Sequence, residues 1–154
     1  MKLPETDRGR FKVLFVCSGN ICRSPLAAAL LERELRVLGT EGVVAESAGT
    51  LDLDGRGASH WAIEVAAENG LDLSHHVSRQ VNKRMLEDAS IVVAMSQGHA
   101  EQLSSILPAV ERRMLVLDVP DPYGLQKQAY EAVFGAIKDA MPLIIDEVRV
   151  KLGQ

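Results

Sequence analysis

The sequence lacks the segments and motifs that mark membrane, secreted and nucleotide-dependent proteins. No stretch approaches the roughly 20 consecutive apolar residues of a membrane-spanning helix, and residues 1–10 are too polar and charged for a signal peptide. There is no G-x-x-x-x-G-K-[ST] loop, no G-x-G-x-x-G fingerprint and no H-E-x-x-H motif. We therefore expect a cytoplasmic protein without nucleotide or nicotinamide chemistry.

Metal ligands and disulfide partners are also scarce. Two cysteines, Cys17 and Cys22, are too few for the disulfide framework of a secreted domain, and two thiols alone make a poor zinc site. The adjacent His75 and His76 cannot share one face of a helix. We expect no metal and no other cofactor, so any chemistry of the cysteines should be thiol chemistry.

The overall charge and size narrow the class of protein further. A formal net charge of -4 gives no electrostatic reason to expect nucleic acid or an anionic membrane as partner. With 154 residues, 47% of them hydrophobic, only six prolines and no repeat, the chain has the composition of one globular domain. We expect a single domain over residues 1–154, with residues 1–10 as a flexible extension, acting as a monomer.

Short apolar runs alternate with helical patterns along the chain. The runs are continuous, which is typical of strands covered on both faces. They lie at residues 11–16, 43–46, 91–95 and 114–117. Helical patterns lie at residues 25–38, 58–69, 80–89, 98–107 and 125–152. His60 and His99 fall near helix starts, and Pro142 should break or kink the last helix. This alternation predicts an α/β protein: a parallel sheet with helices on both faces.

The stretch FVCSGNICRSP, residues 15–25, joins the first predicted strand to the first predicted helix. Ser24 and Pro25 are a good N-cap and first helical residue. Gly19 and Asn20 are residue types that tolerate positive φ, so the backbone can curl until its N–H groups point inward. The sequence therefore predicts an anion-binding loop at the end of the first strand and at a helix N-terminus.

Within this loop, five residues separate Cys17 from Arg23. The guanidinium can bind two oxygens of a phosphate, and the loop, the helix dipole and Arg23 all favour a thiolate at Cys17. This arrangement indicates a nucleophile beneath a bound oxyanion. Cys22 lies in the same loop, where it could either pack beneath it or trap an oxidised Cys17 as a disulfide.

These residues also carry a resemblance. VCSGNICRSPLA resembles the phosphate-binding loop of the low-molecular-weight protein tyrosine phosphatases, and DPYG, at residues 121–124, resembles that family's acid loop. SAGT at residues 47–50 and AMS at residues 94–96 follow in the family's order. The resemblance implies a four-stranded parallel sheet, a phosphate-binding loop after the first strand, and a metal-independent hydrolysis in two steps.

The resemblance also implies roles for individual residues. Cys17 would attack phosphorus, Arg23 would bind the phosphoryl oxygens, and Asp121 would act as general acid and then base. Asp118 also follows the fourth predicted strand, so the resemblance, rather than chemistry alone, selects Asp121. Ser24 would stabilise the thiolate, Asn20 would hold the loop in shape and Tyr123 would form a wall of the pocket. The expected substrate-binding residues are Ser18, Gly19, Asn20, Ile21, Cys22, Ser24 and Tyr123.

The sequence gives conflicting indications of which phosphorylated residue of a protein substrate would be hydrolysed. GRGASHWAIEVAAENGLDL, at residues 55–73, and AMSQGH, at residues 94–99, resemble the protein-arginine phosphatase branch, and Leu53 and Gly124 stand where tyrosine phosphatases often carry aromatics. That branch typically has threonine at the position of Ile21, and this chain keeps the tyrosine phosphatase residue. We expect phosphotyrosine as substrate, with phosphoarginine as the alternative.

Two further alternatives fit the residues less well. An arsenate reductase would need resolving cysteines later in the chain, and none follows Cys22. A non-catalytic phosphate-binding or redox-sensing module would not need the acid Asp121.

Overall fold

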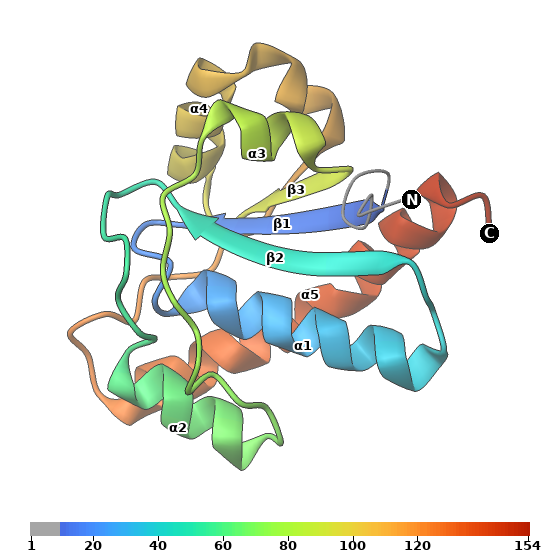
Figure 1. Cartoon of the computed structure of the whole chain (residues 1–154). Helices are drawn as coiled ribbons and strands as arrows, with labels where there is room; N and C mark the ends of the chain where they lie inside the picture. The colour runs from blue at the N-terminus through green and yellow to red at the C-terminus, as the bar shows by residue number, and fades with distance from the viewer. Residues whose placement is uncertain (1–9) are drawn as a thin grey trace.

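The computed structural model describes residues 10–154, and the expected N-terminal extension lies outside this range except for Arg10 (Figure 1). Four strands form one sheet: β1 (Phe11–Cys17), β2 (Val43–Gly49), β3 (Ile91–Ala94) and β4 (Met114–Val116). Their order is β2-β1-β3-β4, and every neighbouring pair is parallel. The predicted four-stranded parallel sheet is confirmed, with strand positions close to those expected.

The helices cover both faces of this sheet, as predicted. They are α1 (Arg23–Leu38), α2 (His60–Glu68), α3 (Lys83–Asp88), α4 (Gln97–Ile106), the 3-10 helix η1 (Pro108–Arg113) and α5 (Lys127–Lys151). Figure 1 shows α1, α2 and α5 on one face and α3 and α4 on the other.

Alternate side chains of β1 enter two separate hydrophobic clusters. Val13 and Phe15 pack with the residues of α1, α2 and α5, whereas Leu14 and Val16 pack with those of α3 and α4. All four side chains are at most 1% exposed, which explains the continuous apolar run in the sequence.

Three details differ from the sequence-based expectation. Pro142 does not break the last helix: it lies inside α5, on its exposed side, while buried residues before and after it pack against the core. Packing of these residues outweighs the loss of one backbone hydrogen bond. The helix expected from residue 80 begins only at Lys83, because the Asn82 side chain accepts a hydrogen bond from Met85 N and caps it there. The helix η1 was not predicted.

The carboxyl ends of the strands meet at one edge. Cys17 ends β1 opposite Gly49, the last residue of β2, and Ala94 ends β3 on the other side of β1. The loop after β1 therefore lies between segments that follow β2 and β3. Among residues 10–154, no helix is both long enough and apolar enough to cross a membrane.

Candidate active site

The loop between β1 and α1 is shaped mainly by Asn20. Asn20 has φ 59°, the one positive φ of a non-glycine residue among residues 10–154. Its side-chain amide donates to Ser24 Oγ at 2.8 Å and Ser47 Oγ at 2.9 Å, and its carbonyl side-chain oxygen accepts from Arg79 N at 2.9 Å. These bonds hold a backbone conformation that L-residues rarely adopt. Gly19, the other residue of the loop whose type tolerates positive φ, does not adopt it.

The backbone of the loop is anchored through its carbonyl groups. Thr50 N donates to Cys17 O and Leu51 N to Ser18 O, both at 2.9 Å, and Ser59 N donates to Ile21 O at 2.8 Å. The backbone N–H groups of residues 18–22 have no acceptor among residues 10–154. A ring of anchored carbonyls and open N–H groups is the arrangement expected of an anion-binding nest.

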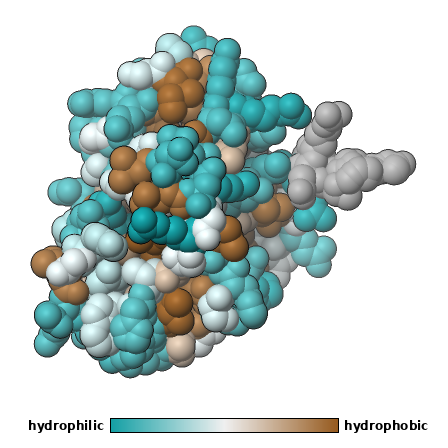
Figure 2. Space-filling model, turned by 60° about the vertical axis from the view of Figure 1, so that its left-hand side comes forward, coloured by the Kyte–Doolittle hydropathy of each residue, from teal (hydrophilic) through white to brown (hydrophobic). Residues whose placement is uncertain are grey.

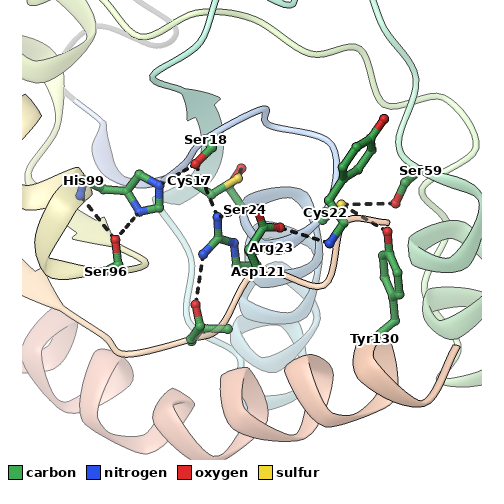
Figure 3. A network of polar contacts seen from close by, with 12 residues as sticks. Cys17, Ser18, Cys22, Arg23, Ser24, Ser59, Ser96, His99, Asp121 and Tyr130 are labelled. Atoms are coloured by element: carbon green, nitrogen blue, oxygen red, sulfur yellow. Dashed lines mark hydrogen bonds and ion pairs between the residues drawn. The ribbon is translucent and has the colours of Figure 1, made fainter. Parts of the chain in front are cut away.

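Cys17 lies at the base of this loop and is 2% exposed. Its Sγ lies 3.0 Å from Ser24 Oγ (Figure 3). Ser24 Oγ also accepts a hydrogen bond from the Asn20 side-chain amide. Ser24 was expected to be the N-cap of a helix starting at Pro25, but α1 begins two residues earlier, at Arg23, and its N-cap is Cys22. The Ser24 hydroxyl is thereby free to contact the thiol, because it lies inside the first turn and not at the cap position.

Arg23 reaches across the loop and is 4% exposed. Its Nη1 donates to Val119 O at 2.9 Å, and its Nη2 donates to Ser18 Oγ at 3.4 Å and lies 3.8 Å from Asp121 Oδ2. Its Nε is buried without a hydrogen-bond partner in the described part of the chain. A buried, unpaired cationic N–H is costly unless an anion binds it.

A pocket opens above the loop. Cys17, Arg23 and Asp121 line it, together with Ile21, Cys22, Ser18, Gly19, Leu51, Leu53, Arg56 and Tyr123. Its walls are largely apolar side chains, and in the space-filling view of this end of the molecule brown apolar surface lies among teal polar residues (Figure 2). The sequence interpretation did not single out Leu51 or Arg56.

Asp121 and Tyr123 come from the loop between β4 and α5. The Asp121 carboxylate is 54% exposed and accepts a hydrogen bond from Tyr123 N at 3.0 Å. Asp118, the other candidate acid, is exposed and does not line the pocket. The structure therefore brings Asp121, and not Asp118, to the residues of the loop.

Cys22, the second cysteine of the loop, is buried as well. It is 4% exposed, and its Sγ lies 3.3 Å from Ser59 Oγ and 3.5 Å from Tyr130 Oη (Figure 3). Burial raises the pKa of the Cys22 thiol, although the hydrogen bonds of Ser59 and Tyr130 oppose this. Burial also raises the pKa of Tyr130 to about 12. Cys22 is therefore a protonated, packed thiol at neutral pH.

Two histidines contact the loop, and sequence reasoning gave neither a place in the site. His76 Nε2 donates to Asn20 O at 2.6 Å. His99, which lies near the start of α4 as predicted, has its Nε2 2.8 Å from Ser18 Oγ. Burial lowers the pKa of each. They lie 56 and 81 residues from their partners, so no local pattern could reveal these contacts. Residues 10–154 contain no group of three or more potential metal ligands.

Known proteins of one family resemble this chain over nearly its whole length. Residues 12–153 match the family model for low molecular weight phosphotyrosine protein phosphatase. The low molecular weight protein-tyrosine-phosphatase Wzb of Escherichia coli strain K12 is 36% identical over 132 residues, which cover 79% of this chain and 84% of Wzb. A protein-arginine-phosphatase of Geobacillus stearothermophilus is 34% identical over 151 residues, covering 92% of this chain and 96% of the relative. The solved structure of Vibrio vulnificus Wzb in complex with benzylphosphonate superposes with a TM-score of 0.81 at 31% identity, covering 90% of this chain and 99% of the other.

Proposed function

The chain belongs to the low-molecular-weight protein tyrosine phosphatase family and is a hydrolase, and on that premise we propose that it hydrolyses phosphotyrosine in proteins through a phosphocysteine intermediate on Cys17. The observation that carries this proposal is the combination of open loop N–H groups, the unpaired Nε of Arg23 and the buried thiol of Cys17 within one loop. Each of these groups would be satisfied by a phosphoryl group bound above the sulfur.

The reaction would take place in two displacements. Cys17 thiolate attacks phosphorus while the bond from phosphorus to the aryl oxygen breaks, and protonated Asp121 gives its proton to that oxygen. Water then attacks the phosphocysteine, and Asp121 takes a proton from it as the sulfur leaves. Arg23 and the loop N–H groups bind the phosphoryl oxygens throughout both steps. The step needs no metal, because positioned N–H groups and a guanidinium stabilise the transferred group.

Supporting residues keep these groups in place. Ser24, 3.0 Å from Cys17 Sγ, would stabilise the thiolate and its departure from the intermediate. Asn20 holds the loop through its three side-chain hydrogen bonds. Arg23 Nη2 lies 3.8 Å from Asp121 Oδ2, which supports a role for Asp121 as the acid beside the group that would bind the phosphoryl oxygens.

The choice of phosphotyrosine depends on the pocket wall. Ile21, Leu51, Leu53 and Tyr123 offer apolar contacts to an aryl ring. The phosphoarginine alternative draws on the relative from Geobacillus stearothermophilus, whose name assigns it that activity. Because Leu53 and Gly124 stand where tyrosine phosphatases often carry aromatic residues, we expect modest activity on phosphotyrosine.

Side-by-side assays of phosphotyrosine and phosphoarginine peptides test the substrate assignment. The native protein should show the higher kcat/KM for phosphotyrosine, and Ile21→Thr should shift the ratio toward phosphoarginine, because threonine adds a hydroxyl. Faster cleavage of phosphoarginine by the native protein would overturn the assignment.

Substitutions test the roles of the nucleophile and the acid. Cys17→Ser should abolish turnover while retaining vanadate binding. Asp121→Ala should lower kcat by about 10²- to 10⁴-fold, with less loss on substrates that have good leaving groups. Asp118→Ala is the matched control and should change kcat little; a large loss there would transfer the acid role to Asp118.

The domain extent, the oligomeric state, the partners and the compartment are also inferred. We propose that the whole chain is one phosphatase domain acting as a monomer on phosphorylated protein, with no nucleic-acid or membrane partner. A reducing compartment such as the cytoplasm suits a mechanism that requires Cys17 as a free thiol, and both cysteines are free in the structure.

A further inference from the structure

A histidine outside the phosphate loop contacts the first side chain of that loop. His99 lies in the first turn of α4 and is 6% exposed. Its Nε2 lies 2.8 Å from Ser18 Oγ, and its Nδ1 lies 2.8 Å from Ser96 Oγ (Figure 3). Ser96 is also the N-cap of α4, since its hydroxyl accepts from His99 N at 3.3 Å. Both ring nitrogens therefore have partners, and the orientation of the ring is set by the start of α4.

The Ser18 hydroxyl connects this histidine to Arg23. Arg23 Nη2 donates to Ser18 Oγ at 3.4 Å, while Nη1 donates to Val119 O at 2.9 Å. The guanidinium is thus held from two directions: by the segment after β4, and by α4 acting through Ser18 and His99. The same Nη2 lies 3.8 Å from Asp121 Oδ2, so a competing partner is close.

The surroundings of His99 favour the neutral imidazole at pH 7. Burial lowers the pKa of His99, and the nearby Arg23 lowers it further, while Asp121 opposes the shift. A neutral ring has one donor and one acceptor nitrogen, and either tautomer satisfies both serine hydroxyls. His99 can therefore orient the Ser18 hydroxyl without placing a second positive charge beside Arg23.

We propose that His99 is a positioning residue for phosphoryl transfer: it orients the Ser18 hydroxyl, which keeps the Arg23 guanidinium facing the loop instead of closing onto Asp121. This inference rests on the proposed function. Without the contact from His99, the Ser18 hydroxyl is no longer held in the orientation that accepts from Nη2, and Asp121 competes for Nη2 more effectively. Phosphoryl binding and stabilisation of the transition state would both weaken, because Arg23 serves both.

Two substitutions at His99 separate this contact from general packing. Glutamine can place an amide group near the position of Nε2, so His99→Gln should retain much of the contact with Ser18. The shorter side chain of asparagine reaches only the position of Nδ1, so His99→Asn should lose that contact while keeping the one with Ser96. His75→Asn, on an exposed histidine, is the control for the same chemical change.

We expect His99→Asn to weaken vanadate binding, measured by calorimetry, and to lower kcat/KM for para-nitrophenyl phosphate, each by about 5- to 50-fold. His99→Gln should recover most of both losses, and His75→Asn should change neither. Ser18→Ala should resemble His99→Asn, and the double variant should be little worse than either single one. Losses that multiply in the double variant, or equal losses in the glutamine and asparagine variants, would overturn the proposal.

A further measurement covers the case in which a His99 variant does not fold. The ¹⁵N shifts of the His99 ring in the native protein report its hydrogen bonds directly, and Ser18→Ala should change the shift of Nε2 while leaving that of Nδ1. An unchanged Nε2 shift would remove the contact on which the proposal depends. Vanadate binding and these shifts do not require turnover, so a native protein that hydrolyses no phosphomonoester would refute the proposed function without deciding the role of His99.

Discussion

A single methyl group added at Gly49 should disable the phosphate loop. Gly49 is the last residue of β2 and lies beside Cys17, the last residue of β1. A Cβ built at Gly49 would lie 2.5 Å from Ser18 O, 2.9 Å from Asn20 N and 3.0 Å from the carbonyl carbon of Gly19. All three are backbone atoms of the loop, so no side chain can rotate away to relieve the contact.

The size of the effect follows from these distances. Ordinary contact begins at 3.4 Å, so the Ser18 carbonyl or the strand must move by 3.4 − 2.5 = 0.9 Å. Gly49 itself is held by hydrogen bonds to Arg79 and Val81 on the other side, at 2.9 and 2.7 Å, so the displacement should fall largely on the loop. A misplacement of about 1 Å at a catalytic site costs about 10²-fold in rate. Overpacking of this kind also costs about 1–3 kcal/mol of stability.

The assay compares Gly49→Ala with Gly135→Ala. Gly135 lies in α5, and a Cβ there would have no neighbour within 4 Å. We expect Gly49→Ala to lower kcat/KM for para-nitrophenyl phosphate by about 10²-fold and to lower Tm by about 2–10 °C. Gly135→Ala should leave kcat/KM unchanged and raise Tm slightly, because alanine is the better helix former. If Gly49→Ala keeps kcat/KM within about threefold of native, the loop is more adaptable than its hydrogen bonds indicate.

Three further predictions concern oxidation, pH and metal removal. Cys22→Ser should retain turnover but lose activity irreversibly after peroxide treatment, whereas the native protein should recover with dithiothreitol because Cys22 traps oxidised Cys17; full recovery of the variant would remove this role for Cys22. Burial lowers the folded-state pKa of His76 and His99 below the ordinary value of 6.5, so the unfolded chain binds more protons. The contribution of these two histidines to the free energy of unfolding should therefore be fully present above pH 6.5 and should decrease as the pH falls below it. The midpoint of urea unfolding measures this, and an unchanged midpoint at pH 5 would contradict it. Prolonged dialysis against a chelator should leave kcat unchanged, and a loss restored by a divalent cation would refute metal independence.

Local sequence was enough to predict the parts of the site that lie close together along the chain. Residues 15–25 combine an apolar strand, a turn with Gly19 and Asn20, an arginine and a helix start, and each of these preferences acts over a few residues. The α/β class followed in the same way from apolar runs alternating with helical periodicity. Even here the sequence could not decide which residue of the turn adopts positive φ. Gly19 and Asn20 both tolerate it, and only Asn20 adopts it. Its side-chain hydrogen bonds to Ser24 and Ser47 make that choice, and Ser47 belongs to another strand.

The partners that reach the loop from elsewhere were decided by the tertiary structure alone. His76, His99 and Gly49 lie beside the loop because β2 and β3 flank β1, so that the segments following them meet at its carboxyl end. Strand order is a long-range property, and residue spacing within one segment carries no information about it. The local sequence around a buried histidine, or around a glycine at a strand end, is the same whether or not a loop packs against it. Their contribution depends on packing between segments far apart in the chain, which no local preference encodes.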